Sequence, residues 1–98
     1  MNININIITP VGNLEDLDET IESINEVSKK LIDYNIRLFL ILNNNINYSL
    51  DEKIILSQNL KVDINNINPI ASRSKARNYA LNKIDATAEN SFTIFLDS

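Results

Sequence analysis

The chain has no cysteine, no histidine and a single glycine among its 98 residues. Without cysteine it can form neither a disulfide nor a catalytic thiolate. Without histidine it also lacks the usual zinc ligands and the base of a Ser-His or Cys-His pair. Any metal ion would therefore have to be held by oxygen atoms.

Long hydrophobic runs are absent as well. No stretch approaches the roughly 20 apolar residues that span a bilayer, and the start of the chain, MNININIITP, lacks the basic residues of a signal peptide. We therefore expect a cytoplasmic protein. The 9 lysines and arginines against 13 aspartates and glutamates give a net charge of −4. This charge predicts no general attraction to nucleic acid or to an anionic membrane, so an anion site would have to be local.

Hydrophobic periodicity predicts four strands that alternate with three helices. The strands are expected at 3–9, 36–42, 60–64 and 91–97, and the helices at 13–34, 49–58 and 71–84. Strands 36–42 and 91–97 are expected to be buried, whereas 60–64 alternates with charge and is placed nearer an edge. The order βαβαβαβ predicts one Rossmann-like α/β domain over residues 1–98. Its sheet would be mainly parallel and four-stranded, in the order 3-2-1-4, with helices on both faces.

Segment 13–34 repeats apolar residues every three or four positions, which predicts an amphipathic helix. Its stripe comprises Leu14, Leu17, Ile21, Ile24, Ser28 and Leu31, widened by Val27 and Ile32. Asn13 is the expected N-cap, and the helix dipole explains the acids that follow and the two lysines near the end. These charged residues are Glu15, Asp16, Asp18, Glu19, Lys29 and Lys30. Capping and dipole compensation therefore account for the acids without a pair of catalytic carboxylates. In segment 49–58, Ser49 and Glu52 have the spacing of a capping box.

Ligands of doubly wound sheets bind beyond the carboxyl ends of the strands, at the point where the strand order reverses. The expected switch point lies between the first and fourth strands. The carboxyl ends carry Thr9-Pro10-Val11, Asn43-Asn44-Asn45 and Asp97-Ser98. These segments are therefore the candidate ligand contacts.

The helix at 71–84 carries three cations in its first turns. On an ideal helix Arg77 falls in the middle of the apolar stripe, with Arg73 beside it and Lys75 on the other side. A buried-face arginine needs an anionic partner, because desolvating an unpaired charge costs several kcal/mol. Arg77 could reach water or pair with a structural carboxylate such as Asp97. Alternatively its fork of donors could reach phosphate oxygens in the ligand crevice.

Four motifs occur in order along the chain: IITPVGN, an apolar strand that runs into a polar loop, SRSKARNYAL, and FTIFLDS. This arrangement resembles the N-terminal part of a family 2 glycosyltransferase of the GT-A fold, over essentially the whole chain. The resemblance implies that this half binds the nucleotide of a UDP- or GDP-sugar, which the complete enzyme transfers to a saccharide or other acceptor.

The resemblance also assigns roles to residues. It implies that Thr9, Pro10 and Val11 lie near the base and ribose, and that Asn43 and Asn44 stand where the family has an acid that binds the base. Arg77 matches the arginine of an Ala-Arg-Asn motif close to the nucleotide. Asp97 matches the first acid of the metal-binding Asp-x-Asp, which holds Mg²⁺ or Mn²⁺ against the diphosphate.

The sequence departs from the family pattern at two further points. Gly12 replaces the aromatic residue that would stack on the base, and Ser98 is reached before the second metal-binding acid and the general base. We therefore expect a fragment of a longer enzyme that acts at the cytoplasmic side of the membrane, with the isolated chain inactive. The alternative is a small α/β interaction or regulatory domain without catalysis. A flavodoxin-like domain is disfavoured because its phosphate loop is absent, and a receiver domain because Thr9-Pro10 replaces its acidic pair. The fourth strand would be an exposed sheet edge that could pair with another copy.

Overall fold

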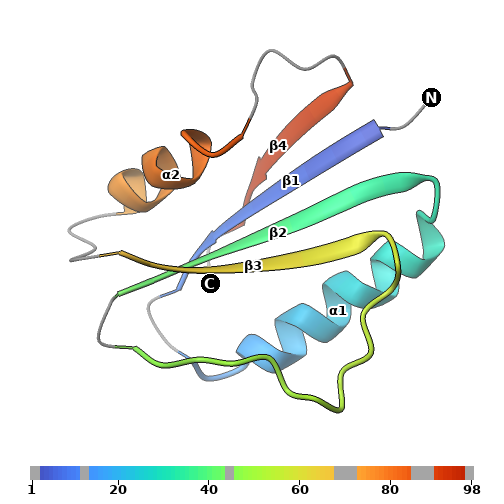
Figure 1. The fold of residues 1–98 in the computed structure, drawn as a ribbon, viewed down its shortest axis with the longest axis horizontal. Helices are drawn as coiled ribbons and strands as arrows, with labels where there is room; N and C mark the ends of the chain where they lie inside the picture. Colours follow the sequence, from blue (N-terminus) through green and yellow to red (C-terminus); the bar gives the residue numbers. More distant parts are fainter. Residues whose placement is uncertain (1–2, 12–13, 44–45, 68–72, 85–89, 97–98) are drawn as a thin grey trace.

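The computed structural model describes residues 3–11, 14–43, 46–67, 73–84 and 90–96. A four-stranded, all-parallel sheet in the order β3-β2-β1-β4 forms its centre (Figure 1). The strands are β1 (Ile3–Pro10), β2 (Tyr34–Asn43), β3 (Leu60–Ile67) and β4 (Ser91–Phe95), and the helices are α1 (Leu17–Lys30) and α2 (Arg73–Leu81). The predicted Rossmann-like fold and its strand order are confirmed.

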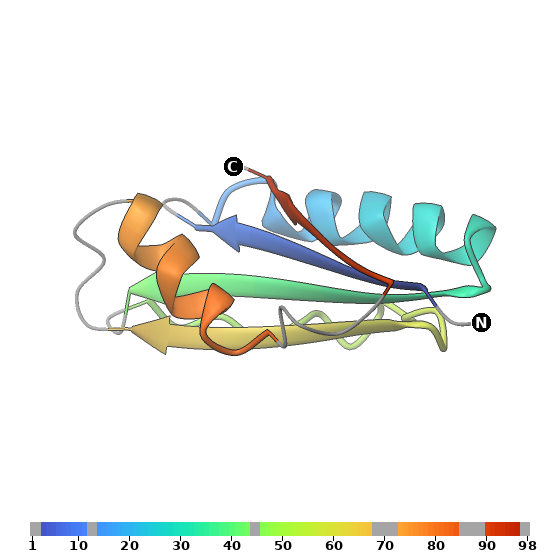
Figure 2. The ribbon, with the colours of Figure 1, turned by 90° about the horizontal axis from the view of Figure 1, so that it is seen from above.

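The two helices cover opposite faces of the sheet, as Figure 2 shows from above. Side chains alternate along each strand, so the two faces have separate cores. On the α1 face, Leu17 and Ile21 pack against Leu38 and Leu40 of β2. On the α2 face, the buried residues are Ile8, Phe39, Ile41, Ile67, Ala76 and Ala80. Strand β2 is buried on both faces, as the unbroken apolar run predicts.

Helix α1 begins later than expected. Its N-cap is Asp16, which has a left-handed backbone (φ 63°) and no side-chain capping bond. The predicted cap Asn13 lies outside the described residues. The expected charge pattern holds at both ends, with acids in the first turn and lysines in the last. The predicted stripe was too wide, because Leu14, Val27 and Ile32 are exposed, whereas the polar Asn25 is buried.

The connection between β2 and β3 contains no helix over its described residues 46–59, so the predicted helix at 49–58 is wrong. The segment runs instead as extended chain and turns beside α1 (Figure 1). Its inward-facing apolar residues pack on the α1-face core: Ile46, Tyr48 and Leu50 before the turn at Asp51, and Ile54 and Leu56 after it. The spacing of two within each group is that of an extended chain. Asp51 forms a local turn, since its Oδ1 accepts from Lys53 N (3.0 Å) and its carbonyl accepts from Ile54 N (3.0 Å). The local bonds of Asp51 replace the predicted capping box.

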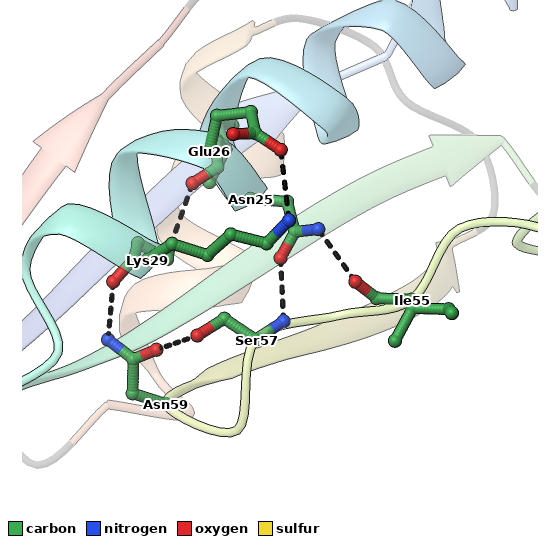
Figure 3. Close-up of polar contacts among 8 residues, drawn as sticks. Asn25, Glu26, Lys29, Ile55, Ser57 and Asn59 are labelled. Atoms are coloured by element: carbon green, nitrogen blue, oxygen red, sulfur yellow. Dashed lines mark hydrogen bonds and ion pairs between the residues drawn. The ribbon is translucent and has the colours of Figure 1, made fainter.

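Two asparagine side chains join this extended segment to α1 (Figure 3). Buried Asn25 donates to Ile55 O (2.8 Å) and accepts from Ser57 N (2.7 Å). Asn59 Nδ2 lies 2.9 Å from each of three carbonyl oxygens at the end of α1 and beyond it, those of Ser28, Leu31 and Tyr34. Asn25 therefore satisfies two main-chain groups that a helix at 49–58 would have paired internally, and Asn59 satisfies carbonyl groups at the C-terminal end of α1 and beyond it.

Strand β4 differs from the prediction of a buried strand. Its side chains are mostly exposed, including Phe92 and Ile94. The strand is short and lies at the end of the sheet, and α1 and α2 leave its faces largely uncovered. Within the described part of the chain, no helix is long and apolar enough to cross a membrane.

Candidate functional site

The carboxyl ends of β1, β2 and β4 meet at one edge of the sheet. Ile8 of β1 pairs in register with Phe95 of β4, and Pro10 pairs with Ile41 of β2. The strand order reverses between β1 and β4, because β2 and β3 follow on one side of β1 and β4 lies on the other. The predicted switch point is therefore present at this edge, which we call the carboxyl edge.

The candidate residues of β1 are buried. Thr9 and Pro10 are inaccessible to solvent or nearly so, and Val11 belongs to the α1-face core. Val11 N also donates to Ile41 O (2.9 Å), which extends the β1–β2 ladder beyond Pro10. Among the described residues, the buried Thr9 Oγ1 has no hydrogen-bond partner. The three side chains are thus packed in the interior rather than presented at the surface of the carboxyl edge.

Of the candidate residues, Arg77 lies on α2, beside the switch point. Its neighbours Ala76 and Ala80 are fully buried against the sheet, and Arg77 itself is half-buried. The guanidinium carbon lies 5.1 Å from the ring centroid of Phe95, at the end of β4. This contact fixes the guanidinium by a cation–π interaction over the last residue of the strand. Lys75 is exposed, as expected for the opposite side of the helix.

The other predicted contacts are described in part or not at all. Asn43 ends β2 and pairs in register with Ile67 of β3, so its main chain lies at the carboxyl edge. Asn44 and Asp97 lie outside the described residues, as does Gly12. Among the residues that are described, no group of three acids could hold a metal ion.

A cavity of about 370 Å³, which we call the basin, lies at the end of the sheet opposite the carboxyl edge. Asn4, Asn6, Asn35, Arg37, Lys61 and Ser91 supply most of its polar lining. Asn6 is more than nine-tenths buried, and its Nδ2 donates to Ser91 Oγ (3.1 Å). This basin was not predicted from the sequence. The pattern that could have indicated it is the alternation of asparagine and isoleucine, which places the amides of Asn4 and Asn6 on one face of β1.

Arg37 is the cation at the margin of this basin. Its Nε donates to the carboxylate of Asp63 on β3, and its guanidinium carbon lies 4.5 Å from the ring centroid of Phe39. Both partners come from the same face of the sheet, since Phe39 and Asp63 are paired in register. Arg37 is thus committed to one carboxylate and one ring, which explains a charged residue inside an apolar strand.

Comparison of the chain with known protein families, with curated proteins and with solved structures found no match. Function must therefore be inferred from the geometry of the carboxyl edge, the basin and the exposed surfaces.

The pKa of one ionisable side chain, that of Tyr48, is strongly raised. Burial, together with a 2.5 Å hydrogen bond to Asp18 Oδ1, raises the pKa of the Tyr48 hydroxyl well above its ordinary value. The negative charges of Asp18 and Asp51 act in the same direction. Tyr48 therefore stays protonated as a donor that ties segment 46–59 to the first turn of α1.

Proposed function

We propose that the carboxyl edge binds the nucleoside diphosphate part of a sugar donor, and that the chain is the donor-binding part of a glycosyltransferase similar to family 2. The observation that carries the proposal is the position of Arg77. It lies on the sheet side of α2, at the switch point between β1 and β4, with its guanidinium over Phe95. An arginine at this place in a doubly wound sheet is suited to the oxygens of a diphosphate.

The charge of the protein makes a local cation important to this proposal. The chain carries a net charge of −4, so its long-range field repels a nucleotide. A cation held at the carboxyl edge would give the ligand a specific local partner. Ring contact with Phe95 also restricts the guanidinium before the ligand arrives, which lowers the entropy cost of binding.

The test is a titration of the ¹⁵N-labelled chain with UDP and with GDP, each with and without Mg²⁺, followed by amide chemical shifts. Shift changes are expected at Asn43, at Phe95 and in α2. Arg77→Ala should weaken binding by about 1.5 to 3 kcal/mol, the range for a hydrogen bond to a charged group. That loss is about ten- to hundredfold in Kd.

Lys75→Ala is the matched control, because it removes the same charge from the exposed side of the same helix. It should leave the affinity nearly unchanged. Equal losses in the two variants would show a nonspecific charge effect and refute the assignment. Shift changes confined to Asn6 and Ser91 would move the ligand to the basin, and the absence of changes at millimolar nucleotide would also contradict the proposal.

The alternative, a non-catalytic interaction domain, is favoured by a different observation. Strand β4 exposes large apolar side chains beside an open sheet edge. Apolar surface of this kind is typical of contacts with another protein chain.

A further inference from the structure

The outer edge of β4 presents main-chain groups that β1 does not use. Asn4 N donates to Asn90 O (2.8 Å), and Leu96 N donates to Ile8 O (2.9 Å). Main-chain groups alternate in direction along a strand, so the even-numbered residues of this segment are paired with β1. The N–H and C=O groups of Ser91, Thr93 and Phe95 therefore point outward. Within the described residues, β4 is the last strand on this side of the sheet.

The two edges of the sheet differ in their protection. Strand β3, at the other edge, carries the charged residues Lys61 and Asp63. Charges on an edge strand discourage pairing with a further strand. The sequence of β4 and the residue after it, SFTIFL, has no charge and no proline. The β4 edge therefore has neither the charges nor the proline that usually prevent a further strand from pairing.

An apolar strip runs along the α1 face of β4. Phe92 and Ile94 are paired in register with Ile5 and Ile7, which pack in the α1-face core, so all four side chains are on that face. We define the β4 strip as Phe92, Ile94 and Leu96, which are 57%, 50% and 39% exposed. Beside it, Val27 of α1 is 53% exposed and lines a hollow of about 170 Å³ between the helix and the sheet.

We propose that a second copy of this chain pairs with β4 in antiparallel orientation about a two-fold axis, with Thr93 opposite itself. In this register the outward groups of Ser91 meet those of Phe95 in the second copy, and the groups of Thr93 meet their own equivalents. All main-chain groups that point outward from β4 are then paired. A two-fold contact of this kind is closed, so it gives a dimer with a continuous eight-stranded sheet.

The side chains of β4 are self-complementary in the same register. On the α1 face, Phe92 lies opposite Ile94 of the second copy, an aromatic and β-branched pair of the kind that stabilises antiparallel strands. On the other face, the two Thr93 side chains lie opposite each other, which is another favourable pair. A different register would separate Phe92 from Ile94 and each Thr93 from its equivalent. The order of residues in β4 therefore favours a second copy of the chain as the partner.

The area available is close to that of a small specific interface. Val27, Phe95 and the β4 strip are each about half exposed. Two copies could bury roughly 700 Å² of these side chains, taking about 100 Å² for half an aromatic ring and about half as much for each aliphatic residue. The paired edges add main-chain area, which brings the total toward the roughly 1,000 Å² of a specific interface. We therefore expect a reversible dimer rather than a permanent one.

Sedimentation equilibrium from 1 µM to 1 mM tests the oligomeric state. A monomer–dimer equilibrium is expected, and Thr93→Lys should weaken it at least tenfold because two like charges would meet on the axis. Ile55→Lys is the matched control, since Ile55 is 81% exposed on the distant segment 46–59. This control should leave the equilibrium unchanged. A strict monomer at 1 mM, open-ended assembly, or equal effects of both variants would overturn the proposal.

Amide hydrogen exchange on the unmodified chain gives a second test that does not depend on a variant folding. The amides of Phe92 and Ile94 should be protected at all concentrations, because they are paired with β1. The amides of Thr93 and Phe95 should become protected only as the concentration rises through the dimer transition. Protection of Thr93 that does not change with concentration would refute pairing between copies.

Discussion

Replacing Asn59 with alanine should destabilise the fold more than any change at an exposed position of the same segment. The Asn59 amide donates toward three carbonyl oxygens, those of Ser28, Leu31 and Tyr34, each at 2.9 Å. An amide NH₂ has only two hydrogens, so the three contacts amount to at most two full hydrogen bonds. At 0.5 to 1.5 kcal/mol for each bond, Asn59→Ala should lower the free energy of unfolding by about 1 to 3 kcal/mol.

Urea unfolding followed by circular dichroism measures this loss. With an m-value of about 1 kcal/mol/M, the midpoint should fall by about 1 to 3 M while m stays constant. Asn59→Asp keeps the shape but removes both donors and places a negative charge at the C-terminal end of α1. It should therefore cost more than alanine. Asn47→Ala, at an exposed position in the same connection, is the control and should change the midpoint little.

An Asn59→Ala midpoint within error of the unchanged protein would show that water replaces the amide at no cost. Equal losses for Asn59→Ala and Asn47→Ala would show that the connection responds to any truncation. Either result would refute the role assigned to this side chain.

Three further outcomes are expected. Phe39→Ala should cost about 3 to 5 kcal/mol in the same urea assay, since the ring is fully buried. Asn90→Val should cost about 1 to 2 kcal/mol more than Asn90→Gly, because Asn90 has a left-handed backbone (φ 60°) that glycine adopts without strain. The raised pKa of Tyr48 means that above its ordinary value of 10.0 the unfolded chain releases a proton that the folded chain keeps. The stability that Tyr48 contributes should therefore be fully present below pH 10 and be lost as the pH rises above it. Tyr48→Phe should accordingly reduce the difference between the urea midpoints at pH 9 and pH 11.

The sequence predicted the sheet well because its strongest patterns report burial. The unbroken apolar run of β2 and the helical stripe of α1 each identify an element by the surface it hides. The strand order then follows from the connections between parallel strands. The exposure of β4 could not be predicted in this way, because an apolar strand has the same sequence whether or not another chain or segment covers it.

The missing helix at 49–58 has a local cause. Ser49 and Glu52 have capping-box spacing, but Asp51 binds the main chain two residues on and favours a turn. Within 49–58 the apolar residues Leu50, Ile54, Ile55 and Leu56 do not alternate, so their spacing alone does not exclude a helix. The long-range bonds of Asn25 and Asn59 could not be predicted either, because they join positions about thirty residues apart.

Among the candidate site residues, Arg77 lies at the flank of the buried face of its helix rather than in its middle, because Ala76 and Ala80 are fully buried, Arg77 is half-buried and Leu81 is exposed. Its contact with Phe95 depends on the tertiary arrangement of α2 over the end of β4, which the spacing of residues does not specify. The burial of Thr9 has the same origin, since it depends on how closely α1 approaches the sheet.

The chain can be cut in the extended connection between β2 and β3 without separating the two resulting fragments. Lys53 lies exposed in a turn of that segment, within reach of trypsin. Cleavage there would leave β1 and β2 on one fragment and β3, α2 and β4 on the other. In the order β3-β2-β1-β4 the first fragment supplies both central strands and the second supplies both outer ones. Each fragment is thus hydrogen-bonded to the other along two strand pairs, and the nicked protein should migrate as one species until it is denatured.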